Sequence, residues 1–112
     1  GTNLVSYVAS KHGLIGLTKA VALETAATRI TCNAICPGDV STRIFYKSAK
    51  DLANAEGITR EEAQARIAAV NMPSGRPVAP EQIAELAAFL CSDAAVEVRG
   101  SAFSIDGAWV AR

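Results

Sequence analysis

The feature that most constrains the fold is a strand, a helix and a second strand in the later part of the chain. Ile30 to Cys36 is short, rich in β-branched residues and stopped by Pro37-Gly38, which predicts a buried strand. A helix from Pro80-Glu81 to Ser92 then precedes a final strand, Ala102 to Ile105. A helical crossover makes two strands parallel, and parallel sheets are normally buried on both faces. Since two strands cannot form a stable sheet alone, the order predicts an α/β chain that is part of a larger doubly wound parallel sheet.

The stretch from Val5 to about Ala27 predicts one long helix, because it lacks proline and is rich in Leu, Ala, Val and Lys. Its apolar residues fall on more than one face, and Ala9, Gly13 and Gly16 add a stripe of small residues. A helix that is apolar nearly all round is usually buried, so we expect this one to pack against two layers. A two-fold contact with a second copy of the chain would supply one of them.

Residues 39–77 form the longest interruption between the predicted strands and are more polar than their surroundings. They predict two amphipathic helices, Thr42 to Ala55 and Thr59 to Val70, broken at Gly57. Thr59 with Glu62 resembles a capping box. Lids over substrates come from weakly packed segments, so we predict that residues 39–77 are a helical insertion that forms the substrate loop.

The composition argues against several classes of function. The 112 residues carry 11 basic and 11 acidic side chains, so neither nucleic acid nor an anionic membrane is an expected partner. No apolar run approaches the roughly 20 residues that span a bilayer, and nothing resembles a signal peptide, so we expect a cytoplasmic location. Cys32, Cys36 and Cys91 form no CxxC pair, which predicts reduced, mostly buried thiols and no metal site.

Tyr7 and Lys11 are the candidate catalytic residues. They lie four positions apart at the start of the long predicted helix, and side chains at this spacing share a helix face. A nearby ammonium favours the phenolate form, which makes Tyr7 a candidate general acid/base for an alcohol or carbonyl substrate. The same spacing is also common in ordinary exposed helices. His12 is a second candidate proton carrier, although a lone helical histidine is more often solvated or hydrogen-bonded.

Several motifs together resemble the short-chain dehydrogenase/reductase family. They are Tyr7-x-x-x-Lys11, Asn33-Ala34-Ile35-Cys36-Pro37-Gly38, Val40 with Thr42, Pro80-Glu81-Gln82-Ile83 and Ile105-Asp106-Gly107. The stretch from Tyr7 to Gly13 and the tail from Trp109 are similar to the bacterial D-3-hydroxybutyrate dehydrogenase subgroup. The resemblance covers the whole chain, so residues 1–112 are expected to be the C-terminal half of one Rossmann-like domain.

The resemblance implies an enzyme that interconverts a secondary alcohol and a carbonyl by hydride transfer. The substrate would be 3-hydroxybutyrate-like or another small hydroxy compound. Tyr7 would exchange a proton with the substrate oxygen, and both Tyr7 and Lys11 would contact the cofactor, Lys11 at the nicotinamide ribose. The resemblance also implies a homo-oligomer, with a tetramer as the expected state.

The expected cofactor is NAD or NADP, with NAD favoured. Pro37 and Gly38 end the first strand at its carboxyl edge, where open α/β sheets hold ligands. By the resemblance, Val40 would offer backbone groups to the carboxamide, and the Thr42 hydroxyl would lie near the carboxamide or pyrophosphate. A strand-ending turn at Pro37-Gly38 and packing or helix capping by Val40 and Thr42 are the alternatives.

Two parts of such an enzyme, the glycine-rich phosphate loop and the catalytic serine, have no match in the 112 residues. We therefore expect the chain alone to be inactive, and a truncated, non-catalytic fragment or assembly module is the alternative function.

Other departures concern the substrate and the packing. Leu4 stands where hydroxybutyrate enzymes carry a carboxylate-binding lysine, and Ser48 where they carry a glutamine, which favours a neutral or more apolar substrate end unless Lys47 compensates. Arg99 replaces a frequent threonine before Gly100.

Overall fold

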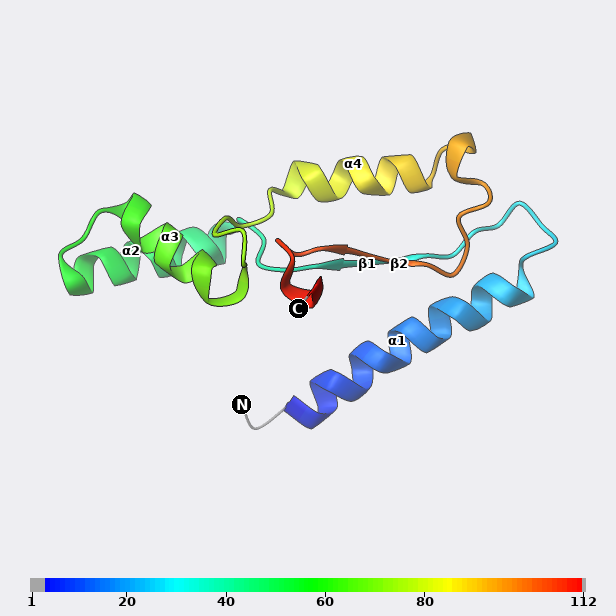
Figure 1. The fold of residues 1–112 in the computed structure, drawn as a ribbon, viewed down its shortest axis with the longest axis horizontal. Coiled ribbons are helices and arrows are strands. Elements are labelled where there is room, and N and C mark those ends of the chain that lie inside the picture. The colour runs from blue at the N-terminus through cyan, green and yellow to red at the C-terminus, as the bar shows by residue number, and fades with distance from the viewer. Residues whose placement is uncertain (1–3, 112) are drawn as a thin grey trace. The chain divides into compact units, whose positions relative to one another are not determined.

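A computed structural model describes residues 4–111, which form helices and a two-stranded sheet (Figure 1). The elements in chain order are α1 (Leu4–Glu24), β1 (Ala34–Pro37), α2 (Arg43–Glu56), α3 (Arg60–Asn71), α4 (Pro80–Leu90), the 3₁₀ turn η1 (Asp93–Ala95), β2 (Ala102–Ile105) and the 3₁₀ turn η2 (Trp109–Ala111). Two compact units divide these residues: the chain through Ile35 with Ala87–Phe103, and Cys36–Leu86 with the residues from Ser104 onward.

The strands β1 and β2 are parallel neighbours, as the predicted α/β class requires. The N–H of Ala34 donates to the carbonyl of Ser101 at 2.9 Å, and the N–H of Gly38 donates to that of Ile105 at 3.0 Å. Donors and acceptors thus advance together along both strands. The prediction of a strand from Ile30 was wrong for its first four residues, because β1 begins only at Ala34. In that stretch Asn33 bonds by its side chain, donating to the carbonyl of Val98 at 2.8 Å.

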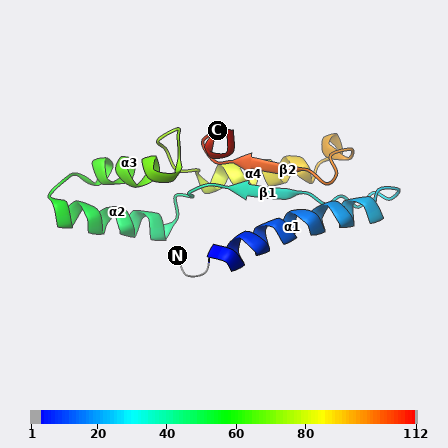
Figure 2. The ribbon, with the colours of Figure 1, turned by 60° about the horizontal axis from the view of Figure 1, so that its bottom comes forward.

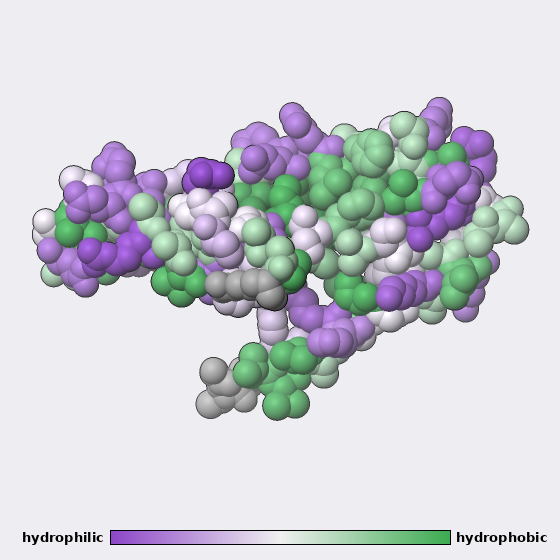
Figure 3. Space-filling view, in the orientation of Figure 1, coloured by the Kyte–Doolittle hydropathy of each residue, from purple (hydrophilic) through white to green (hydrophobic). Residues whose placement is uncertain are grey.

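In the first unit, α1 confirms the predicted long helix but ends at Glu24 rather than near Ala27. Only Thr18 and Ala22 are buried on it, so the expected burial against two layers is not met within the described residues. The contact that exists is with Gly100, where an added Cβ would come within 3.2 Å of the Ala22 Cβ. Apolar side chains at the N-terminal end of α1 lie on the surface, as Figure 3 shows. The described residues supply no second layer to cover them.

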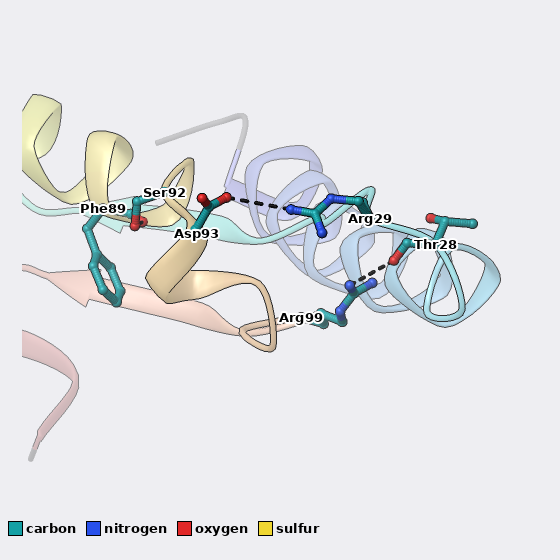
Figure 4. Close-up of polar contacts among 6 residues, drawn as sticks. All are labelled: Thr28, Arg29, Phe89, Ser92, Asp93 and Arg99. Atoms are coloured by element: carbon teal, nitrogen blue, oxygen red, sulfur yellow. Dashed lines mark hydrogen bonds and ion pairs between the residues drawn. The ribbon is translucent and has the colours of Figure 1, made fainter.

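Arg99 fastens the loop that follows α1 in the first unit (Figure 4). Its Nε donates to the carbonyl of Val96 at 2.8 Å, and its Nη2 donates to that of Thr28 at 2.8 Å. Its Nη1 donates to the carbonyls of Thr25 at 3.2 Å and Ile30 at 3.1 Å. The planar, five-donor guanidinium suits this task, which no shorter side chain at position 99 could perform. Arg99, which stands where a threonine is frequent, therefore makes four hydrogen bonds to backbone carbonyls, and we call this arrangement the Arg99 clamp.

Replacing Arg99 by alanine should lower the free energy of unfolding of the full-length protein by about 1–3 kcal/mol, since four charged hydrogen bonds to backbone carbonyls are lost, two of them part-buried. Chemical denaturation measures the loss. Arg29→Ala is the matched control: Arg29 pairs with Asp93 at 3.6 Å, but both side chains are solvated (Figure 4). Such surface pairs contribute little, so its unfolding midpoint should stay at the wild-type value. Equal midpoints for the two variants would contradict the clamp.

In the second unit, α2 and α3 form a helical hairpin and lie side by side in both ribbon views (Figures 1 and 2). The break predicted between the two helices is confirmed: Gly57 ends α2 in the left-handed region, with φ of 66°. The Thr59 hydroxyl accepts from the N–H of Glu62 at 3.1 Å, which is the N-terminal half of the expected capping box. A small core of Ala49, Ala53 and Ala63, flanked by Leu52, Ile58 and Ile67, holds the hairpin together.

Three further observations on the described residues concern membrane spans, metal ligands and cysteines. None of their helices combines the length and apolarity needed to cross a lipid bilayer. Within 4–111 no three His, Cys, Asp or Glu side chains gather as metal ligands would. All three cysteines are free, but none of them is buried, so the expectation of mostly buried thiols was wrong. Cys32 and Cys36 are partly exposed, and Cys91, just after the last turn of α4, is exposed.

Candidate active site

The first turns of α1 bring Tyr7 and Lys11 together. The Nζ of Lys11 lies 5.4 Å from the centroid of the Tyr7 ring, so the two side chains share a helix face as their spacing predicts. Tyr7 is 60% exposed, and Lys11 is exposed beside it. A phenol beside an ammonium on an exposed helix face can contact a ligand and exchange a proton with it.

His12 is occupied within the same helix. Its Nδ1 lies 2.9 Å from the carbonyl oxygen of Val8, one turn earlier. The bond ties the imidazole to the backbone of α1. This agrees with the hydrogen-bonded alternative and gives no support to a second proton carrier.

Pro37 and Gly38 lie at the carboxyl end of β1, in the second unit. Pro37 is exposed, while Gly38 is closely packed: a Cβ there would be 2.5 Å from the Met72 Sδ and 3.0 Å from the Asp106 Cα. Only glycine therefore fits without displacing its neighbours. This packing role explains Gly38 by itself, and a role of Pro37 and Gly38 in cofactor binding stays a prediction.

Val40 presents its backbone amide away from its neighbouring segment. The N–H of Val78 donates to the carbonyl of Asp39 at 2.7 Å, and the N–H of Ser41 donates to the carbonyl of Val78 at 2.9 Å, which makes a parallel bridge between Val40 and Val78. In parallel pairing this pattern directs the groups of Val40 itself to the other side. Among the described residues nothing accepts from its N–H, so the amide is available to a ligand.

Thr42 stands at the N-cap position of α2, yet its side chain makes no capping hydrogen bond. The capping alternative is therefore not what the structure has. Thr42 is exposed, and its side chain lines a cavity of about 340 Å³. Its hydroxyl is free to bond to a molecule in this cavity.

The cavity lies within the second unit, between the loop after β1 and the α2–α3 hairpin. Its lining residues are Asp39, Val40, Thr42, Ile44, Phe45, Ser48, Ile67 and Asn71. It thus unites Val40 and Thr42 with Ser48, which the resemblance placed near the substrate. Asp39 and Asn71 were missed at the sequence level. The position of Asp39 just beyond the carboxyl end of a strand was the available signal, whereas nothing local singles out Asn71.

Two other residues that the resemblance linked to the substrate, Leu4 and Lys47, are not among the lining residues of this cavity. Leu4 is 61% exposed on α1, in the first unit. Lys47 pairs with Asp51 on the surface of α2, with Nζ 3.0 Å from Oδ2, and is not among the lining residues. Compensation by Lys47 is therefore unsupported. Tyr7 and Lys11 belong to the first unit, and the other four predicted site residues belong to the second.

Comparison with known proteins identifies the family to which the chain belongs. The model of a family described as Enoyl-(Acyl carrier protein) reductase matches residues 1–109. A D-beta-hydroxybutyrate dehydrogenase of Cupriavidus necator is 48% identical over 107 residues, which are 96% of this chain and 42% of that protein. The chain belongs to the short-chain dehydrogenase/reductase family. It spans about two fifths of the length of the curated relatives that it matches.

Solved structures of this family have the same fold. A short chain dehydrogenase family protein from Francisella tularensis is similar with a TM-score of 0.76 and 36% identity, over 95% of this chain and 43% of that one. L-sorbose reductase from Gluconobacter frateurii, solved with NADPH and L-sorbose, is similar with a TM-score of 0.78 and 33% identity, over 90% of this chain and 38% of that one. The predicted Rossmann-like class is confirmed.

Proposed function

We propose that the full-length protein is an NAD(P)-dependent short-chain dehydrogenase/reductase that interconverts a secondary alcohol and a carbonyl. Its substrate is a small hydroxy compound, 3-hydroxybutyrate-like or another of that size. The observation that carries this proposal is the contact between Lys11 and Tyr7, 5.4 Å from ammonium nitrogen to ring centroid on an exposed helix face. The similarity to a D-beta-hydroxybutyrate dehydrogenase, at 48% identity, supports the reaction class.

In alcohol oxidation, Tyr7 takes the hydroxyl proton while the hydrogen on the same carbon leaves with its electron pair, so that a carbon–oxygen double bond forms. The nicotinamide cofactor, held by residues such as Val40 and Thr42, would supply the hydride acceptor for this oxidation and the hydride donor for its reverse. Lys11, whose Nζ lies 5.4 Å from the centroid of the Tyr7 ring, would bind the nicotinamide ribose. In carbonyl reduction Tyr7 returns the proton to the oxygen, which makes it a general acid.

The residues of the second unit fit a nicotinamide cofactor. The N–H of Val40 has no acceptor among residues 4–111, and the Thr42 hydroxyl makes no capping bond. These two groups would bind the carboxamide of the nicotinamide and the cofactor atoms next to it. They do not distinguish NAD from NADP, and NAD is favoured through the resemblance to hydroxybutyrate dehydrogenases.

The proposal is tested with purified full-length protein. NAD⁺ and NADP⁺ are each offered with a panel of secondary alcohols, including D-3-hydroxybutyrate, and the reduced nicotinamide is followed by its absorbance. Turnover with at least one alcohol is expected, and faster turnover with NAD⁺. If no alcohol reduces either cofactor, although the protein is folded, a non-catalytic assembly module becomes the better account.

We also propose that α1 is an association surface and that the full-length protein is a homotetramer. Apolar side chains such as Leu14, Leu17 and Leu23 are exposed on this helix, and Gly13 and Gly16 leave open space beside them. Exposed apolar surface of this kind commonly marks an interface. Light scattering on the full-length protein should give four times the subunit mass, and a stable monomer at micromolar concentration would contradict the interface.

A further inference from the structure

The cavity beside α2 has an unusual electrostatic character for a site that would hold an organic acid. Its polar lining side chains are Asp39, Thr42, Ser48 and Asn71, and no Lys, Arg or His is among the lining residues. The rest of the lining is apolar. The only formal charge that the lining brings to the cavity is therefore the negative charge of Asp39.

The α2–α3 hairpin that flanks the cavity carries five cations, and none of them is among the lining residues; Arg43, Lys50 and Arg60 lie outside the lining, and the other two are held by acidic partners. Lys47 is held by Asp51 on the exposed side of α2. Arg66 of α3 pairs with Glu56 at the end of α2, again outside the lining residues. These two cations are neutralised by their partners, so neither offsets the charge of Asp39.

Asp39 retains acceptor capacity toward the cavity. Its Oδ2 accepts one long hydrogen bond, 3.4 Å from Asn71 Nδ2. A carboxylate accepts at two oxygens, so most of its capacity remains for a donor inside the cavity. A substrate hydroxyl can supply such a donor, whereas a substrate carboxylate would be repelled, because like charges at close range in a protein site interact strongly.

We propose that the preferred substrate is a neutral compound that carries a second hydroxyl in addition to the reacting alcohol, and that Asp39 accepts a hydrogen bond from this hydroxyl. The inference rests on the proposed function and narrows its substrate class. Thr42, Ser48 and Asn71 add neutral polar partners, and the apolar side chains cover the carbon skeleton. Small organic acids such as 3-hydroxybutyrate are then poor substrates.

Two probes with the same carbon skeleton test the proposal on the full-length enzyme. D-3-hydroxybutyrate and (R)-1,3-butanediol have the same reacting alcohol, but one ends in a carboxylate and the other in a hydroxymethyl group. We expect kcat/KM for the diol to exceed that for the acid by about tenfold or more, the order expected for a like-charge contact in a binding site. A preference for the acid would overturn the proposal.

Two variants assign the preference to Asp39. Asp39→Asn keeps the shape and removes the charge, so the diol-to-acid ratio should fall by about tenfold, mainly through a lower KM for the acid. Ser48→Lys adds a cation to the lining and should lower the ratio further. The control is Glu61→Gln, which removes the same charge from an exposed position in the first turn of α3, outside the lining, and should leave the ratio unchanged.

The possible outcomes distinguish a failure of the proposed role of the cavity from a failure of the proposed hydride-transfer function. A ratio that neither Asp39→Asn nor Ser48→Lys changes would overturn the role of the cavity, while turnover of either probe would keep the hydride-transfer function. No turnover of any alcohol would overturn both.

Discussion

Replacing Tyr7 by phenylalanine in the full-length protein should lower kcat by about a hundredfold or more, the range expected when a general acid/base is lost. The change removes only the hydroxyl and leaves the ring beside Lys11, so the fold and the ring–ammonium contact should survive. Steady-state turnover measures the loss, and cofactor titration by fluorescence should give a Kd within a few-fold of the wild-type value.

The chain offers a matched control in its other tyrosine. Tyr46 is an exposed residue of α2 whose ring meets Phe45 edge to face, with centroids 5.5 Å apart, and Tyr46→Phe removes the same atom from a different unit. Its kcat should stay near the wild-type value. Near-normal turnover in Tyr7→Phe would show that another group carries the proton.

Replacing Met72 by alanine should lower the free energy of unfolding by about 2–5 kcal/mol, the usual cost of truncating a buried methionine. Met72 is 2% exposed and is the largest fully buried side chain described. It fills the space beside two glycines at the strand ends: a Cβ added at Gly38 or Gly107 would come within 2.5 Å or 3.0 Å of Met72 atoms. Truncation would therefore leave a cavity next to the candidate site.

Chemical denaturation of the full-length protein measures this loss, and two variants calibrate it. Met72→Leu nearly conserves volume and should cost less than about 1.5 kcal/mol. Val70→Ala truncates an exposed side chain two positions earlier and should have little effect. A loss in Met72→Ala no larger than in Val70→Ala would mean that the packing at Gly38 and Gly107 does not depend on Met72.

The helices could be predicted from local sequence signals, because the residues that begin and end a helix act within a few positions of it. Gly57 supplies the left-handed residue that ends α2, and Thr59 caps the next helix. The strand from Ile30 was overestimated for the opposite reason. The carbonyl of Ile30 accepts from Arg99, which is 69 positions away, so a distant side chain replaces the expected ladder there.

The residues of the candidate site also fall into two groups, those that a local sequence pattern predicts and those that only the folded chain brings together. The contact of Tyr7 and Lys11 follows from helical periodicity alone, and it was predicted. Asp39 and Asn71 are 32 positions apart, and only the folded hairpin makes them line one cavity. Whether a side chain such as Thr42 caps its helix or stays free depends on its rotamer, which no sequence pattern determines.

The bridge between Val40 and Val78 has a consequence for how this chain can change over evolution. It joins the two ends of the α2–α3 segment, so the segment leaves and re-enters the rest of its unit at one point. Lengthening a loop whose ends are already joined costs little entropy, about 0.6 kcal/mol for each doubling of its length. The segment can therefore lengthen, shorten or be exchanged with that of a relative while the strand ends keep their spacing. Chimeras that swap residues 41–77 would vary this segment while the helix that carries Tyr7 and Lys11 stays unchanged.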